Sequence, residues 1–180
     1  MPRTEQDGAS RTRTVLASEF VQDLQSLDVD ELRRRRDEAL AEREFQSFLR
    51  RLLQVRQDLL VNERSRRSTG EETGSLVDRL TSILAEGPQG RGRGEALRLA
   101  LPDADVAEAE RRADELLAEA GLSSLEHLEE EQLDSVLDAL ERGQREVSSD
   151  RTAVIRVHDR LQEELKRRYR ADHSQILRPL

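Results

Sequence analysis

The sequence predicts an all-α protein: an antiparallel two-helix coiled-coil hairpin with a helical connector and flexible termini. Two long stretches without proline repeat apolar residues three and four positions apart, which places those residues on one face of a helix. The chain of 180 residues is 38% charged and only 2% aromatic. Helices this polar bury too little apolar surface alone, so each long helix needs a partner, and strand patterns are absent.

Residues 1–26 are predicted to be a flexible arm. Residues 1–13 are polar and are expected to be disordered, as chain ends often are. A short helical segment is expected around Leu16 to Leu24, because Leu16, Phe20 and Leu24 are spaced four apart on one helical face.

The first long helix is predicted over residues 27–69. Asp28 is a suitable N-cap, Glu31 stands at the capping-box position, and Leu27 and Leu32 occupy the positions of a hydrophobic staple. No residue breaks the pattern before Thr69-Gly70. The expected heptad seam consists of Phe45, Phe48, Leu52, Val55 and Leu59, widened by Leu49, Leu53 and Leu60.

Residues 70–127 are predicted to be an acidic connector that contains two short helices. Ser75 is a suitable cap for the first, which runs to about Glu86 with apolar residues Leu76, Val77, Leu80, Ile83 and Leu84. Residues 87–94 are too rich in glycine for a regular element. No strand precedes this loop and no Gly-Lys-Ser/Thr follows it, which disfavours a phosphate loop. After Pro102, Asp105 and Glu108 form a second capping box for a helix that ends at Gly121.

The second long helix is predicted over residues 128–170, and residues 171–180 are expected to be a disordered tail. Gly143 interrupts this helix at a cost of about 1 kcal/mol relative to alanine. The expected seam repeats every seven residues at Leu140, Val147, Val154 and Leu161, and Leu133, Leu137 and Leu165 extend it.

Charge is distributed unevenly along the chain. The formal net charge is −8, but residues 31–67 carry +4, residues 141–170 carry +3, and residues 71–140 carry −12. Two mildly basic helices are therefore separated by an acidic connector. The negative net charge disfavours an anionic partner at first sight, whereas the positive charge of the two long helices allows them to bind an anion. A solvated helical face is the alternative interpretation of these charges.

Composition excludes several classes of function. The chain has no cysteine, which excludes a disulfide scaffold, a cysteine zinc site and a thiol nucleophile. The three histidines are far apart, so no metal is expected, and no Ser/His/Asp arrangement supports an enzyme. No apolar run reaches the ~20 residues of a membrane span. We therefore expect a non-enzymatic cytoplasmic protein without a membrane partner.

A polar pattern occurs once in each long helix. The spacing Ser-x2-Arg-x3-Gln-x3-Asp keeps its four side chains within about 80° of one another on a helix. In the first helix this stripe lies roughly opposite the expected apolar face, and in the second it lies beside that face. The first stripe is Ser47, Arg50, Gln54 and Asp58; the second is Ser148, Arg151 and Asp159, with Ile155 in place of glutamine.

The residue types of the stripes suit a guanine nucleotide. Arginine presents a planar fork that matches phosphate oxygens or the O6/N7 edge of guanine. A carboxylate accepts hydrogen bonds only, so it suits the N1–H and N2–H2 donors of guanine. Two such stripes facing each other across a hairpin would suit a symmetric, guanine-bearing, dianionic ligand. The alternative is that both stripes are solvated helical faces.

Four sequence blocks match a known pattern: Asp28-Val-Asp-Glu-Leu-Arg33, Ser47-Phe-Leu-Arg-Arg-Leu-Leu-Gln-Val-Arg-Gln-Asp58, Val147-Ser-Ser-Asp-Arg151 and Arg167-Arg-Tyr169. Through these blocks the sequence resembles the anti-sigma factor RsiG family, also called aerial mycelium formation proteins. The resemblance extends from about Leu16 to Arg170. The family carries a twice-repeated Glu-x3-Ser-x2-Arg-x3-Gln-x3-Asp motif; here Arg43 and Gln144 replace its leading glutamates.

The resemblance implies that the two long helices bind cyclic di-GMP and that the loaded protein sequesters a sporulation sigma factor of the WhiG type. Arg50 and Arg151 would bind guanine edges or phosphates, and Asp58 and Asp159 would read guanine, supported by Ser47, Gln54 and Ser148. Direct DNA binding is not expected. The main alternative is a coiled-coil adaptor that needs no nucleotide. A hairpin that binds nucleic acid through its basic helices is a third interpretation.

Overall fold

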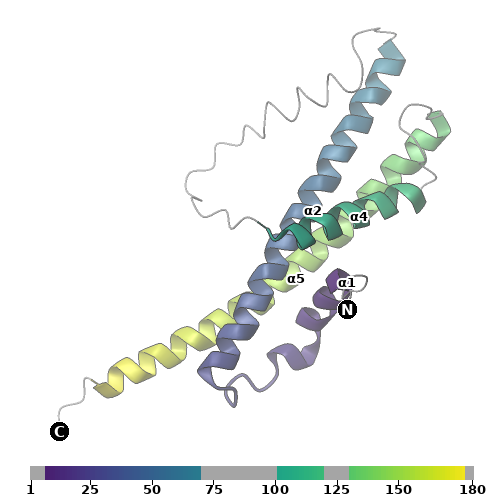
Figure 1. The fold of residues 1–180 in the computed structure, drawn as a ribbon. Coiled ribbons are helices and arrows are strands. Elements are labelled where there is room, and N and C mark those ends of the chain that lie inside the picture. Colours follow the sequence, from purple (N-terminus) through teal and green to yellow (C-terminus); the bar gives the residue numbers. More distant parts are fainter. Residues whose placement is uncertain (1–6, 70–100, 120–129, 177–180) are drawn as a thin grey trace.

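The computed structural model describes residues 7–69, 101–119 and 130–176, most of which lie in helices (Figure 1). The helices are α1 (Asp7–Leu16), the 3-10 helix η1 (Ser18–Val21), α2 (Val29–Thr69), α4 (Asp103–Glu119) and α5 (Glu130–Ile176). The long helices α2 and α5 pack side by side and antiparallel, which confirms the predicted all-α helical hairpin. The helix expected at 75–86 and the loop at 87–94 lie outside the described residues.

Helix α2 begins as its capping signals predict. The backbone N–H of Glu31 donates to Oδ1 of Asp28 at 2.7 Å, and this bond satisfies one free donor of the first turn. Leu27 and Leu32 join the same apolar cluster. The carboxylate of Glu31 does not complete the capping box, because it accepts hydrogen bonds from Arg34 and Arg35.

The buried face of α2 agrees with the expected seam in part. Four expected members are buried, and the other four are only half-buried. The buried ones are Phe45, Leu49, Leu53 and Leu60, together with Leu32 and Ala39; the half-buried ones are Phe48, Leu52, Val55 and Leu59. The expected seam also left out two polar residues of α2 that are buried: Glu42 is 0% exposed and Gln46 is 1% exposed. The polar members extend the buried face away from the expected apolar seam.

The buried face of α5 agrees with the expected seam. Leu133, Leu140, Val147, Val154, Leu161 and Leu165 are all buried, and only Leu137 is half-buried. Gly143 lies on this face beneath α4. A Cβ atom built at this position would approach Cδ1 of Leu116 to 2.8 Å, so the end of the Leu116 side chain would have to shift to make room for it.

The two long helices repeat each other with an offset of 101 residues. The buried Leu32, Ala39, Leu53 and Leu60 of α2 correspond at this offset to Leu133, Leu140, Val154 and Leu161 of α5. The two polar stripes have the same offset, since Ser47 corresponds to Ser148 and Asp58 to Asp159. Because the helices are antiparallel, this repeat gives the hairpin an approximate two-fold symmetry.

Helix α1 is docked on the hairpin, which corrects the expectation of disorder for residues 7–13; residues 1–6 lie outside the described residues. In α1, Val15 is fully buried in the cluster that contains Val154 and Leu161. Phe20 of η1 joins that cluster and is 8% exposed. Apolar burial and the polar contacts described below hold the segment. Residues 171–176, expected to belong to a disordered tail, continue α5.

Helix α4 begins at Asp103, two residues before the expected cap at Asp105. The carboxylate of Asp105 accepts hydrogen bonds from Nη1 of Arg11 at 3.0 and 3.3 Å, so it joins α4 to α1. Ala109 and Ala113 of α4 are fully buried against the hairpin. Their small side chains allow α4 to pack closely.

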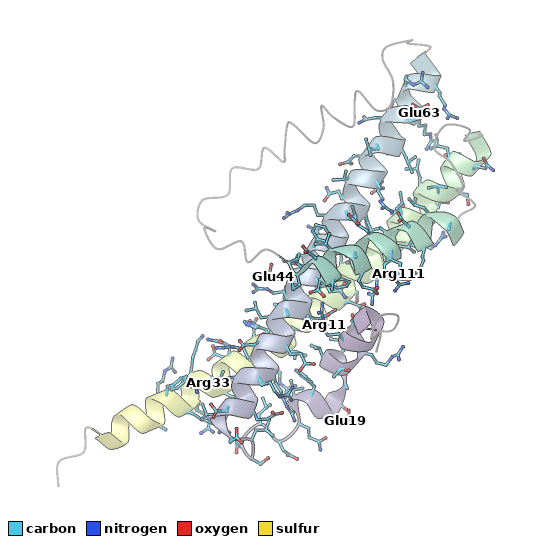
Figure 2. All side chains as sticks on the ribbon, viewed as in Figure 1. Arg11, Glu19, Arg33, Glu44, Glu63 and Arg111 are labelled. Atoms are coloured by element: carbon cyan, nitrogen blue, oxygen red, sulfur yellow. The ribbon has the colours of Figure 1, made fainter. Side chains whose placement is uncertain are left out.

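A buried polar cluster joins α1, α2 and α4, and we call it the Glu42 cluster. Its member Arg11 on α1 is labelled in Figure 2. Glu42 accepts hydrogen bonds from Nε of Arg11 and Oγ1 of Thr12, both at 2.6 Å, and from Nε2 of Gln46 at 2.7 Å. Guanidinium groups of Arg11 and Arg112 lie 5.2 and 5.1 Å from the ring centre of Phe45. Both carboxylate oxygens of Glu42 thus accept hydrogen bonds, which offsets the free-energy cost of burying its charge.

Candidate functional site

The two stripes lie along the same edge of the α2–α5 pair. At 100° per residue, each stripe is rotated in the same sense by about 105–125° from the buried face of its helix. In two antiparallel helices that face each other, rotations of the same sense point to the same edge. We call it the stripe edge; its residues are Ser47, Arg50, Gln54, Asp58, Ser148, Arg151 and Asp159. The first stripe is thus beside the buried face, not opposite it.

One hydrogen bond joins the two stripes directly. Nε of Arg151 donates to Oγ of Ser47 at 2.8 Å, and the Ser47 hydroxyl donates to the carbonyl of Arg43 at 2.7 Å. Ser47 and Arg151 are both half-buried. The structure therefore brings together one residue from each predicted half-site, and it holds the Arg151 fork at the junction of the helices.

The other stripe residues are not held by each other. Arg50, Gln54 and Asp58 are exposed, and among the residues described none of the three has a side-chain partner. Asp159 lies 3.3 Å from Nδ1 of its neighbour His158. By contrast, many arginines elsewhere on α2, such as Arg34, bind carboxylates one turn away. Arg50 is thus available to an anion from solution.

The stripes overlap over only part of their length. The pairs Ser47–Arg151 and Gln57–Gln144 show that residue n of α2 lies across from about residue 200 − n of α5. Asp58 and Asp159 therefore lie at opposite ends of the stripe edge, about 25 Å apart along the axis at 1.5 Å per residue. The serines and arginines occupy its centre.

Gln57 and Gln144 contribute a contact that the motif did not predict. Nε2 of Gln144 donates to Oε1 of Gln57 across the two helices. At the other departure from the family motif, Nε and Nη2 of Arg43 donate to Oε1 of Glu44. The 101-residue offset could have pointed to these contact residues from the sequence, because it relates Arg43 to Gln144 and Gln57 to His158.

Helices α1 and α4 cover the other edge of the hairpin. Phe45 and Glu42, which they contact, are rotated away from the stripe edge, and Arg56 binds Asp114 of α4 at 2.6 Å. Within the described ranges, no stripe residue has a hydrogen bond or ion pair with α1 or α4. The stripe edge is therefore not covered by either helix.

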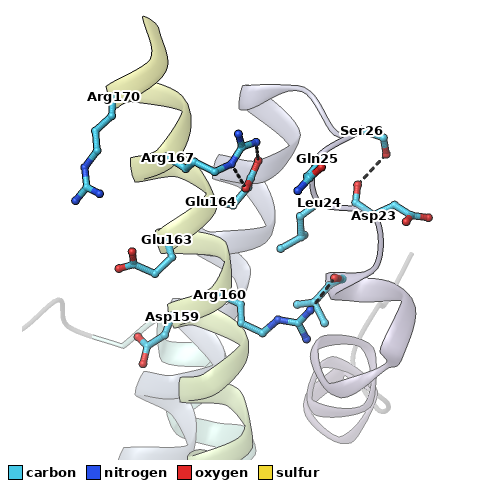
Figure 3. Close-up of a pocket in the computed structure, with 11 residues that line it drawn as sticks. Asp23, Leu24, Gln25, Ser26, Asp159, Arg160, Glu163, Glu164, Arg167 and Arg170 are labelled. Carbon is cyan, nitrogen blue, oxygen red and sulfur yellow. Dashed lines mark hydrogen bonds and ion pairs between the residues drawn. The ribbon is translucent and has the colours of Figure 1, made fainter. Parts of the chain in front are cut away.

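A wide hollow lies elsewhere, between α5 and the turn that follows η1 (Figure 3). It has a volume of about 1020 Å³ and is wide open to solvent. Arg168 fixes this turn by donating to the carbonyls of Leu24 and Gln25 at 2.7 and 3.2 Å. Of the stripe residues only Asp159 borders the hollow, and the charges around it are mixed. The stripes form an exposed edge and do not line this hollow.

A glutamate bound by two arginines follows each stripe by five residues. Glu63 accepts from Arg66 and Arg67 at 2.6 and 2.9 Å, and Glu164 accepts from Arg167 and Arg168 at 2.6 and 3.0 Å. Hydrogen bonds from these arginines, with Arg66 and Arg167 contributing most, lower the pKa of each glutamate to about 2. The two clusters obey the 101-residue offset.

These two glutamates predict a loss of stability in acid. Their pKa is about 2 in the folded chain and 4.5 for the free side chain, so their contribution is complete above pH 4.5 and is lost as the pH falls towards 2. The free energy of unfolding, measured with denaturant by circular dichroism, should decrease over this window. The double variant Glu63→Gln/Glu164→Gln should show a shallower decrease, and an identical slope would contradict the prediction.

The part of the chain that the structure describes contains neither a candidate metal site nor a membrane-spanning helix. No group of three or more histidine, aspartate or glutamate side chains there is arranged to hold a metal ion. In the same residues, no helix combines the length and the apolar character needed to cross a membrane.

The fold and its exposed polar edge define a helical protein with a binding surface. The RsiG-like family model matches residues 18–84, and the predicted resemblance to this family is confirmed over that segment. The match includes η1, α2 and the first stripe, whereas the second stripe lies beyond it. No curated protein matches the chain. The family is one of regulatory anti-sigma factors rather than enzymes, and the match suggests an anti-sigma role with a sigma factor as partner.

Proposed function

We propose that the protein is an anti-sigma factor that binds cyclic di-GMP along the stripe edge and in that state sequesters a sporulation sigma factor of the WhiG type. The observation that carries the proposal is the contact between the stripes, in which Arg151 bonds Ser47 across the helices. Two arginines and five other polar residues along one uncovered edge suit a ligand with two phosphates and two guanines.

In this proposal Arg50 binds the ligand first, because it has no partner to lose among the residues that the structure describes. Arg151 must exchange its bond to Ser47 for a bond to the ligand. Asp58 and Asp159, at the two ends of the edge, accept hydrogen bonds from guanine N1 and N2. The bound nucleotide joins α2 to α5 and completes the surface that the sigma factor contacts.

Titration of the purified chain with cyclic di-GMP, followed by calorimetry, tests the first step. Arg50→Ala should weaken binding about tenfold or more, because a bidentate arginine contact contributes about 1–3 kcal/mol. Arg51→Ala is the matched control: Arg51 is exposed and among the described residues has no partner, but it lies outside the stripe. The absence of heat up to high micromolar nucleotide, or equal losses in both variants, would exclude nucleotide binding at this edge.

A pulldown of WhiG-type sigma factor with and without cyclic di-GMP tests the second step. Retention only in the presence of nucleotide supports the full proposal. Retention that does not depend on nucleotide, and that survives Arg50→Ala, would instead indicate the coiled-coil adaptor.

A further inference from the structure

The two ends of the stripe edge differ in chemistry, although the 101-residue offset relates them. Asp58 lies at one end and Asp159 at the other, and we call them the Asp58 end and the Asp159 end. Asp58 has no side-chain partner among the described residues, whereas the Asp159 carboxylate lies 3.3 Å from Nδ1 of His158. The carboxylate of Asp58 is therefore the more available acceptor of the two.

Amide side chains gather at the Asp58 end. Gln54 lies one turn before Asp58 on α2, and Gln144 of α5 lies across from about residue 56 in the antiparallel register. Nε2 of Gln144 donates to Oε1 of Gln57, and neither side chain has another hydrogen bond within the described ranges. Gln144 therefore keeps Oε1 available as an acceptor, and Gln57 keeps both N–H groups of Nε2 available as donors.

The equivalent positions at the Asp159 end carry no such set of amides. They hold an apolar side chain, an imidazole and a guanidinium in place of the three amides. The pairs at the 101-residue offset are Gln54 with Ile155, Gln57 with His158 and Gln144 with Arg43. The guanidinium of Arg43 is already bound to Glu44. None of these three positions of the Asp159 end can present both a donor and a free acceptor as an amide does.

An exposed apolar side chain also lies at the Asp58 end. Val61 follows Asp58 by three residues and points within about 30° of the mean direction of the first stripe, at 100° per residue. Its side chain is 45% exposed, and within the described residues only Tyr169 is a second large apolar side chain with such exposure. The equivalent position at the Asp159 end is Gln162, which is polar and half-buried. Val61 therefore offers apolar surface that the other end lacks.

These groups match the features of a guanine base. Its N1–H and N2–H2 donors suit the free carboxylate of Asp58, and its O6 and N7 acceptors suit the N–H groups of Gln57. The flat face of a base is apolar enough to gain from contact with Val61. The Asp159 end offers a carboxylate that His158 already contacts, without the amide pair and without the apolar side chain.

We infer that the Asp58 end is the primary guanine site of the stripe edge, where Gln57, Gln144 and Val61 bind the base together with Asp58. The Asp159 end holds its base more weakly and is filled second. This inference rests on the proposed function, because it takes cyclic di-GMP as the ligand. It adds three side chains to the site and an order of binding to its two ends.

Methyl NMR of the full chain tests the order of binding, because Val61 and Ile155 place a methyl group at each end. During titration with cyclic di-GMP, the Val61 signals should shift at about tenfold lower nucleotide concentration than the Ile155 signal, a difference of about 1.4 kcal/mol. Coincident midpoints, or an earlier shift of Ile155, would overturn the inference. The absence of any shift, together with the absence of heat in calorimetry, would contradict the proposed function and this inference with it.

Matched substitutions at the two ends supply a second test by calorimetry. Val61→Ser should weaken the tighter binding step about fivefold and Gln57→Ala about tenfold, because each removes a contact with the base. The controls at the offset positions, Gln162→Ser and His158→Ala, should change this step by less than about twofold. Equal losses at the two ends would overturn the inference.

Gln57→Ala also separates base recognition from helix packing. The variant should lose about tenfold of the preference for cyclic di-GMP over cyclic di-AMP, because the amide contacts read the guanine edge. A loss of helix packing alone would weaken both nucleotides equally. An unchanged preference would therefore overturn the assignment of Gln57 to the guanine site.

Discussion

Replacement of Val154 by aspartate should abolish the folded hairpin. Val154 of α5 is fully buried in the apolar cluster that also contains Val15 of α1. The variant therefore buries a carboxylate that has no hydrogen-bond or charge partner in this cluster. The cost, about 4 kcal/mol or more, is a large part of the 5–15 kcal/mol that stabilises a typical domain. Helical circular dichroism at 25 °C should fall strongly, and cooperative thermal unfolding should disappear.

The control for this variant is Arg156→Asp, two residues further along α5. Arg156 is exposed and has no ion pair among the described residues, so its replacement should change the free energy of unfolding by less than about 1 kcal/mol. Equal melting curves for the two variants would contradict the assignment of Val154 to the core.

Replacement of Glu42 by alanine should produce the second-largest loss. Arg11, Thr12 and Gln46 all donate to this fully buried carboxylate, and its removal takes away the charged acceptor that the three side chains share. We expect the free energy of unfolding to fall by about 3 kcal/mol, the low end for a broken buried pair, because Arg11 retains Asp105. Exchange of the α1 amides should also accelerate, since the cluster holds α1 in place.

Glu44→Ala is the control for the Glu42 cluster. Glu44 pairs with its neighbour Arg43 near the surface, and such pairs contribute less than about 1 kcal/mol. If Glu44→Ala and Glu42→Ala lower stability equally, the Glu42 cluster does not hold the helices together. Glu42→Gln, which keeps an acceptor, should fall between the two.

Much of the fold follows from local rules that the sequence displays. The cap at Asp28 and the heptad stripe from Leu133 to Leu165 predict the start of α2 and the buried face of α5. The helical segment at Asp7–Leu16 was not predicted, because its stability comes from Val15 and from Arg11 contacts with residues 31 and 94 positions away. Long-range contacts of this kind have no periodic signature.

The buried face of α2 was predicted only in part, for a related reason. An apolar pattern finds Leu49, Leu53 and Leu60, but it passes over Glu42 and Gln46, whose carboxylate and amide N–H groups have partners on α1 and α2. The stripe residues were recognised from their spacing alone. Their placement on one shared edge required the true buried faces, which the sequence pattern located correctly only on α5.

The contact between Arg33 and Tyr169 gives the molecule a built-in optical probe. Tyr169 is the only tyrosine and the chain has no tryptophan, so emission excited near 280 nm comes from this single ring. Nε and Nη2 of Arg33 donate to its hydroxyl at 2.9 and 2.7 Å, where the start of α2 meets the far end of α5. Tyrosine fluorescence and its anisotropy therefore report separation of the two helices at that end alone, without any label.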